Sequence, residues 1–92
     1  MYTVKFTSDY KKSFKKIKKR GLDITLLNEV IDKLRRGKKL ESKYKEHILT
    51  GKYKGFYECH IKPDWLLIYY FKKDVLVLTL VDTGTHSDLF DK

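Results

Sequence analysis

The side chains best suited to chemistry near neutral pH are the three histidines of this 92-residue chain, His47, His60 and His86. An imidazole can take up or release a proton in this pH range, as general acid–base catalysis requires. A carboxylate, Asp64, follows His60 by four residues and could orient or share such a proton. Taken singly, each histidine could equally be structural or exposed. A candidate site therefore depends on whether the fold brings them together.

Other kinds of catalytic site find little support in the sequence. None of the histidines has the i, i+2 or i, i+4 partner typical of zinc sites. The single cysteine, Cys59, can form neither an internal disulfide nor a cysteine-based zinc site. Ser87 follows His86 directly, but adjacency does not bring a hydroxyl to the neighbouring ring, and the glycines lack phosphate-loop spacing. We therefore predict acid–base chemistry without a metal or a cofactor.

The first half of the chain predicts one strand and two helices. Apolar residues alternate over residues 2–6, which is typical of a short strand. Apolar residues at helical spacing then predict a helix that ends at Gly21 and a second from Asp23 to about Arg36. The link between them is so short that we expect an antiparallel helical hairpin. Residues 38–51 show no periodicity and predict a loop.

The second half predicts three strands, over about residues 53–61, 65–71 and 75–82, joined by turns short enough for hairpins. The order β-α-α-β-β-β predicts an α+β domain over residues 1–92, with the helical hairpin packed on a small, mainly antiparallel sheet.

This topology predicts that His60, Asp64 and His86 converge. Hairpin pairing brings the His60 end of one strand beside Asp64 and Trp65 at the start of the next. Because the last strand is also antiparallel to its neighbour, it ends near the same place, and His86 follows the Gly84 break. We therefore expect these groups at one edge of the sheet.

Basic side chains flank this predicted edge. Lys52, Lys54 and Lys62 could hold phosphate groups. Strand alternation places Lys54, Glu58 and His60 on one face.

Aromatic residues near the same edge could stack on an unpaired base. The aromatic residues there are Phe56, Tyr57, Trp65 and Phe90, of which Trp65 and Phe90 are the main candidates, although Trp65 could equally be a core residue. Together with the lysines and histidines, they favour an enzyme that acts on single-stranded RNA.

The net charge of +9 is confined to the first half of the chain. Residues 1–40 carry 13 basic and 4 acidic side chains, whereas residues 41–92 carry 8 of each. Such a surface attracts nucleic acid or an acidic protein partner, although it could also be a solvated face that only keeps the protein soluble. Apolar stretches are far shorter than the roughly 18 residues of a membrane span, and the N-terminus has no signal core, so we expect a cytoplasmic protein.

Three blocks of sequence carry a family resemblance: YKEHILTG at residues 44–51, ECHIKPDWLLIY at 58–69 and GTHSDLF at 84–90. In this order they resemble the YafQ-type branch of the RelE toxin superfamily. The resemblance implies the toxin of a type II toxin–antitoxin pair, a ribosome-dependent endoribonuclease that cuts mRNA in the A site. It also implies a cognate antitoxin that holds the toxin inactive, a monomeric free toxin, and a complex with two or more toxin copies.

The functional positions of that family carry over to His47, His60, Asp64, Trp65, His86 and Phe90. Our hypothesis makes His86 the general acid and Asp64, alone or through His60, the base or its orienting group. His47 then contacts the phosphate. The expected products are a 2′,3′-cyclic phosphate and a 5′-hydroxyl.

The chain departs from the family at two positions, because Tyr57 and Asp82 stand where relatives usually have arginine. Positive charge for the transition state must then come from the lysines named above or from a protonated histidine. Two rival functions follow from the same residues: a non-catalytic toxin of this fold that inhibits a protein target, and an RNA-binding module.

Overall fold

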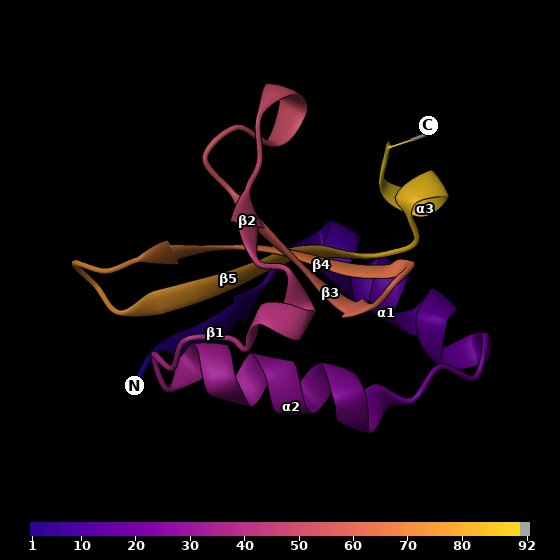
Figure 1. Ribbon diagram of the computed structural model, residues 1–92, viewed down its shortest axis with the longest axis horizontal. Helices are drawn as coiled ribbons and strands as arrows, with labels where there is room; N and C mark the ends of the chain where they lie inside the picture. Colours follow the sequence, from indigo (N-terminus) through magenta and orange to yellow (C-terminus); the bar gives the residue numbers. More distant parts are fainter. Residues whose placement is uncertain (91–92) are drawn as a thin grey trace.

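The computed structural model describes residues 1–90, so the last two residues of the predicted domain lie outside the described part. Its centre is a five-stranded sheet with the order β1-β5-β4-β3-β2 (Figure 1). Only β1 runs parallel to its neighbour, β5, and the other described pairs are antiparallel. The strands are β1 (Thr3–Phe6), β2 (His47–Ile48), β3 (Tyr57–Lys62), β4 (Trp65–Lys72) and β5 (Val77–Gly84). The predicted α+β class and mainly antiparallel sheet are confirmed.

The two long helices are α1 (Ser8–Lys19) and α2 (Ile24–Arg35); in Figure 1, α2 runs below the sheet and α1 lies behind it. Each begins at a capping side chain that accepts a backbone N–H: Thr7 from Tyr10, and Asp23 from Thr25. Gly21 follows α1 with a φ of +79°, a left-handed conformation that glycine adopts without strain. The sequence signals for helix start and stop are therefore confirmed.

The main core lies between the sheet and these two helices. Both helices contribute fully buried side chains, such as Ile17 and Leu27, which pack with Leu67, Leu78 and Leu80 of the sheet. The apolar stretches of β4 and β5 are explained by their central places in the sheet, where both faces are covered.

A smaller apolar cluster covers the opposite face of the sheet. Leu66 and Ile68 of β4 pack there with Leu89 of the short helix α3 (His86–Phe90), and Leu49 and Phe56 border them. This cluster fixes α3 and the segment around β2 above the sheet in Figure 1. It thereby holds the segments that carry His86 and His47.

The region predicted as a loop contains more structure than expected. It holds two short 3-10 turns, η1 (Ser42–Tyr44) and η2 (Gly51–Tyr53), and the two-residue strand β2. The strand predicted from residue 53 begins only at Tyr57. Segments of two or three residues are too short to show periodicity, which is why the sequence did not reveal them. Among residues 1–90, no helix has the length and apolarity to span a membrane.

Candidate active site

The three histidines lie in a row along one end of the sheet, although they come from three different elements. His47 in β2 pairs with Glu58 in β3, and His60 of β3 lies opposite Leu66, which in turn pairs with Gly84 just before His86. The ring centroids of His47 and His60 are 6.3 Å apart, and those of His60 and His86 are 6.1 Å apart. The structure therefore brings His60 and His86 to one edge, as the topology argument predicts, and β2 adds His47 to them.

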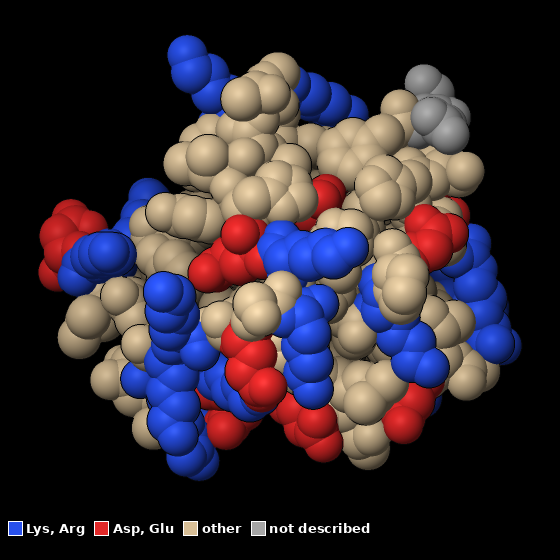
Figure 2. All heavy atoms as spheres, in the orientation of Figure 1, with Lys and Arg blue, Asp and Glu red and all other residues tan. Residues whose placement is uncertain are grey.

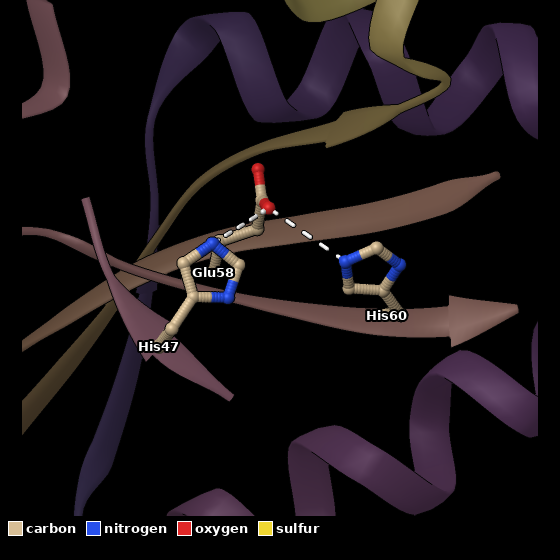
Figure 3. Close-up of side chains that lie close together, drawn as sticks. All are labelled: His47, Glu58 and His60. Atoms are coloured by element: carbon tan, nitrogen blue, oxygen red, sulfur yellow. Dashed lines mark ion pairs between the residues drawn. The ribbon is translucent and has the colours of Figure 1, made fainter. Parts of the chain in front are cut away.

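Glu58 lies between the first two histidines and points toward both (Figure 3). Its Oε1 is 3.2 Å from Nε2 of His47 and 3.9 Å from Nε2 of His60. Only 4% of the Glu58 side chain is exposed, and its Oε2 has no hydrogen-bond partner among the described residues. Glu58 was not among the predicted site residues. The signal that could have found it is its i, i+2 spacing from His60, which places both side chains on one face of the strand.

The Nδ1 atoms of these two rings bind backbone carbonyls. His47 Nδ1 is 2.9 Å from the carbonyl oxygen of Lys45, and His60 Nδ1 is 3.2 Å from that of Pro63. A carbonyl oxygen can only accept, so each Nδ1 carries the hydrogen. In the neutral ring, the free lone pair is therefore on Nε2, the atom that faces Glu58.

His86 has a carboxylate of its own. Its Nδ1 lies 3.3 Å from Oδ1 of Asp64, and its backbone N–H donates to the same oxygen at 3.2 Å. The backbone hydrogen bond, followed by the bond with the ring, lowers the pKa of Asp64 below the ordinary value. Asp64 therefore contacts His86, and the carboxylate beside His60 is Glu58. The expectation that Asp64 acts through His60 has no contact to support it.

The position of His86 depends on how α3 is held to the sheet. Asp88 and Thr85 cap each other: Thr85 N–H donates to Asp88 Oδ2 at 3.0 Å, and Asp88 N–H donates to Thr85 Oγ1 at 3.1 Å. Asp88 also accepts two hydrogen bonds from Arg20 at the end of α1. A Cβ at Gly84 would lie 2.8 Å from Asp88 Oδ2, and the Gly84 φ of +153° also disfavours any other residue. Only glycine fits at this turn.

The aromatic candidates differ in their surroundings. Trp65 is 2% exposed, and its Nε1 donates a hydrogen bond of 3.0 Å to Thr83 Oγ1 in the core. The structure therefore corrects the expectation that Trp65 stacks on a base, because no face of its ring is open. Phe90 is 43% exposed, and its ring centroid lies 6.0 Å from that of His86. It remains a candidate stacking surface, with Tyr53 packed edge-on against it at 5.8 Å.

The three candidate lysines are all exposed. Lys52 and Lys54 lie on and next to η2, and Lys62 ends β3 two residues after His60. Beside His60 there is a pocket of about 530 Å³, whose lining includes Lys43, Lys45, Tyr44, Lys62 and Pro63. In the view of Figure 2, which has the orientation of Figure 1, Lys and Arg side chains project from the surface with Asp and Glu between them.

Neither position where the family usually has arginine faces the histidines. Tyr57 stacks on Tyr69 with ring centroids 5.9 Å apart, next to the main core. Asp82 is 2% exposed and accepts hydrogen bonds from Ser13 Oγ of α1 and from Thr83 N–H. Both side chains are therefore engaged in the core, Tyr57 through ring packing and Asp82 through hydrogen bonds.

The arginines and the cysteine of the chain are also engaged elsewhere. Arg20 is paired with Asp88, and both Arg35 and Arg36 are paired with Asp32. Burial raises the pKa of the Cys59 thiol to about 12, so that it is a poor nucleophile. Positive charge near the histidines is thus left to lysine and to imidazolium.

Comparison with known proteins places the chain among bacterial toxins. Residues 2–91 match the model of a family described as the bacterial toxin of a type II toxin–antitoxin system, YafQ. The mRNA interferase toxin YafQ of Escherichia coli K12 is 35% identical over 88 residues, which cover 95% of this chain and 94% of that protein.

Solved structures agree with this result. A metal-bound toxin from Helicobacter pylori has a TM-score of 0.92 and 43% identity, covering 98% of this chain and 100% of that one. YafQ from Escherichia coli BL21(DE3) has a TM-score of 0.90 and 30% identity, over 98% of this chain and 99% of that one. A chain of the Escherichia coli DinJ–YafQ complex has a TM-score of 0.87 and 31% identity, with the same coverage.

Proposed function

Because the chain belongs to the YafQ family of type II toxin–antitoxin toxins, we propose that it is an mRNA interferase that cuts mRNA in the ribosomal A site. The observation that carries this proposal is the row of three imidazoles with Glu58 between two of them and Asp64 beside the third. A protein that only binds RNA or a protein target does not need three titratable rings side by side.

RNA supplies its own nucleophile, so the enzyme needs a base, an acid and positive charge. The base takes the proton of the 2′-hydroxyl, and the 2′-oxygen forms a bond to phosphorus while the bond to the 5′-oxygen breaks. The acid gives its proton to the leaving 5′-oxygen. The products are a 2′,3′-cyclic phosphate and a 5′-hydroxyl, so the electrons and protons balance without a metal. The Helicobacter pylori toxin was solved with a bound metal, but this reaction does not require one.

We assign the base to His60 and the acid to His86. The His60 Nε2 faces the Glu58 carboxylate, which stabilises the imidazolium that forms when the ring accepts a proton. Asp64 does the same for a His86 that begins as imidazolium and then donates. The two rings are 6.1 Å apart, which leaves room for a phosphate between them. His47, on the other side of Glu58, contacts a phosphate oxygen.

The transition-state charge comes from lysine side chains in this proposal. Lys62 follows His60 by two residues, and Lys52 and Lys54 lie on and next to η2, whose Tyr53 packs against Phe90. Lysine is a point charge and lacks the planar fork with which arginine binds two phosphate oxygens. We therefore expect slower cleavage than in a relative with an arginine at the site. Phe90 supplies the stacking surface for a base.

We also propose a cognate antitoxin as the partner that blocks the toxin, by analogy with the DinJ–YafQ complex. A groove of about 620 Å³ lies between β1, α1 and α2, and its floor includes Phe6, Tyr10 and Phe14. Lys11 and Lys15 stand at its rim. An amphipathic antitoxin segment with acidic residues fits both features. The free toxin is then a monomer that acts on cytoplasmic ribosomes.

Binding to the ribosome and binding to the antitoxin should differ in how strongly they depend on salt concentration. Ribosome binding rests on phosphate contacts and should weaken steeply with salt, whereas antitoxin binding rests partly on buried apolar side chains and should weaken less.

The test is cleavage of a defined mRNA on purified ribosomes with an empty A site, with the 5′ ends of the products mapped. Wild type should cut within A-site codons, and His86→Ala should not. Lys73→Ala, at the exposed turn between β4 and β5, is the matched control and should cut like wild type. Ribosome binding without cuts by the wild-type chain would favour the rival, a toxin that acts by binding alone.

A further inference from the structure

We propose that the pocket beside His60 binds the nucleobase on the 5′ side of the bond that is cut, and that Glu29 in the pocket lining makes guanine the preferred nucleobase there. This inference rests on the proposed function, because it concerns the RNA substrate of the same site. It adds a subsite and a specificity-determining residue outside the histidine row.

The pocket lies at the part of β3 that β2 leaves uncovered. β2 is two residues long and pairs with β3 at Tyr57 and Glu58. Beyond this pairing, the edge of β3 borders a pocket of about 530 Å³, which is bounded by η1 and by α2, the helix below the sheet in Figure 1. Small-molecule pockets have volumes of about 300 to 1,000 Å³. The pocket therefore has room for one nucleobase.

The lining of the pocket suits a nucleotide. Leu26 of α2, Ile61 of β3 and Tyr44 of η1 supply apolar and aromatic walls. Three exposed lysines stand at the rim: Lys43, Lys45 and Lys62. Proteins bind unpaired RNA nucleobases by stacking and by hydrogen bonds to the base edges, and lysines hold the adjoining phosphates. Apolar walls with a basic rim provide both kinds of contact.

The position of His60 decides which nucleotide enters the pocket. His60 contributes to the lining, and it is the general base of the proposed reaction. The proton that it removes comes from the 2′-hydroxyl of the nucleotide on the 5′ side of the bond that is cut. The nucleobase of this nucleotide is attached to the same ribose. It is therefore the nucleobase within reach of the pocket.

The nucleotide on the 3′ side lies toward His86. This ring gives its proton to the leaving 5′-oxygen in the proposed reaction, and the ring centroid of Phe90 lies 6.0 Å from it. Phe90 therefore stacks on the nucleobase on the 3′ side. With one nucleobase in the pocket and the next on Phe90, the mRNA can cross the site in one direction only.

Glu29 supplies the acidic group of the pocket lining. It follows Leu26 by three residues on α2, and this spacing places both side chains on one face of the helix. The Glu29 side chain is exposed, so its oxygens are accessible to a ligand. A carboxylate in the lining accepts hydrogen bonds from a nucleobase that carries N–H groups on the facing edge.

The four nucleobases differ in the donors that they offer to this carboxylate. Guanine has two adjacent donors on its Watson–Crick edge, N1–H and the 2-amino group, and a carboxylate can accept both at once. Adenine and cytosine offer one amino group beside a ring nitrogen that repels the carboxylate, and uracil offers one N–H between two carbonyls. We therefore expect a preference for guanine of about five- to tenfold, at the low end for a two-bond contact because Glu29 is exposed.

The test uses nucleoside 3′-monophosphates, which carry the nucleobase, the ribose and the 3′-phosphate of the proposed nucleotide but no bond to cut. Their binding is followed through the backbone amide signals of isotope-labelled toxin in nuclear magnetic resonance spectra. 3′-GMP should shift the amides around His60 and Tyr44 and bind about five- to tenfold more tightly than 3′-AMP, 3′-CMP and 3′-UMP. 5′-GMP should bind more weakly, because its phosphate cannot lie between His60 and His86 while guanine occupies the pocket.

Three variants separate recognition of the nucleobase from attraction of the phosphate. Glu29→Gln should bind the four 3′-nucleotides with about equal affinity. Lys43→Ala should weaken all four to a similar degree, because a phosphate contact does not distinguish nucleobases. Asp74→Asn also removes an exposed carboxylate, in the turn between β4 and β5, and is the matched control that should keep the preference for guanine. Circular dichroism reports whether each variant folds.

Cleavage on ribosomes is then mapped on mRNAs that differ in the nucleotide before the cut. Wild type should cut most often after guanine, and Glu29→Gln should lose this preference. Equal affinity of wild type for the four 3′-nucleotides, equal binding of 5′-GMP and 3′-GMP, or a preference that folded Glu29→Gln retains would each overturn the inference. Absence of cleavage by wild type would instead count against the proposed function, and the nucleotide titrations would still decide the subsite.

Discussion

The Arg20 guanidinium at the end of α1 donates two hydrogen bonds to the Asp88 carboxylate in α3, at 2.7 and 3.1 Å. The two residues are 68 positions apart in the sequence, and their pairing ties the first long helix to the helix that carries His86. This bidentate pair is thus a positioning device for the proposed acid, although neither residue touches the histidine row. Asp88 also accepts a hydrogen bond from the backbone N–H of Thr85, and this bond fixes the start of α3.

Replacing Arg20 by alanine should slow cleavage about 10- to 100-fold, because a small displacement of a catalytic group is that costly. The loss should appear in kcat, with KM for ribosomes nearly unchanged. Arg20→Lys keeps the charge but lacks the planar guanidinium that donates two hydrogen bonds to Asp88, so it should recover only part of the cleavage rate. Arg36→Ala removes another exposed ion pair, with Asp32, and is the matched control. If it slowed cleavage equally, lost charge and not misplacement of His86 would be the cause.

The same pair predicts how the stability of the fold depends on acid. The hydrogen bonds from Arg20 and then from Thr85 hold the pKa of Asp88 well below the ordinary value of about 3.9 for an aspartate. A lowered pKa stabilises the folded state at every pH above the unfolded value, and that contribution is lost as the pH falls below it. Wild type should therefore lose thermal stability relative to Asp88→Asn between pH 5 and pH 2.

The measurement is the unfolding temperature of both proteins at pH 7 and in steps down to pH 2. At pH 7 wild type should be the more stable, and the difference should shrink as the acid titrates Asp88. A difference that stayed constant over this range would show that the carboxylate charge contributes nothing.

Much of the site followed from the sequence because it depends on regular elements. Alternation and helical spacing were enough to predict the strands and helices, and antiparallel pairing alone brought His60 and His86 to one edge. Glu58 was noted on the face of His60 but not assigned to the site. Its importance comes from its burial and from β2, a strand of two residues that sequence patterns cannot show.

Trp65 shows a second limit of the sequence. An aromatic residue at the start of a strand can stack on a ligand or fill the core, and only its packing decides. The bond from its indole to Thr83, which in turn donates to the carbonyl of Leu66, joins two adjacent strands. Asp82, at a position where relatives usually have arginine, shows the same limit. Its hydrogen bond with α1 cannot be predicted from the residue pattern of β5.

Trp65 and Phe90 should therefore respond to mutation in opposite ways. Trp65→Phe should lower the free energy of unfolding by about 1–3 kcal/mol, because it leaves a gap and removes a buried hydrogen bond. Phe90→Ala should leave stability within about 0.5 kcal/mol but weaken cleavage, because it removes an exposed stacking surface. Urea unfolding and single-turnover cleavage measure the two effects. A Phe90→Ala variant that cuts at the wild-type rate would exclude this ring from RNA binding.

Introducing the arginine that relatives usually carry at position 82 should damage this chain. Asp82→Arg places a larger cation where the structure has a buried carboxylate bonded to Ser13 and Thr83. An unpaired buried charge costs about 3 kcal/mol or more, so the variant should unfold at lower urea and gain no cleavage rate. Asp82→Asn, which keeps the shape and can still accept from Ser13, is the control and should lose less. An Asp82→Arg variant that folds and cleaves faster than wild type would contradict this prediction. It would show that β5 can turn this side chain toward the histidines, and that the cleavage rate of the wild-type toxin is limited by the lack of a guanidinium group at the site.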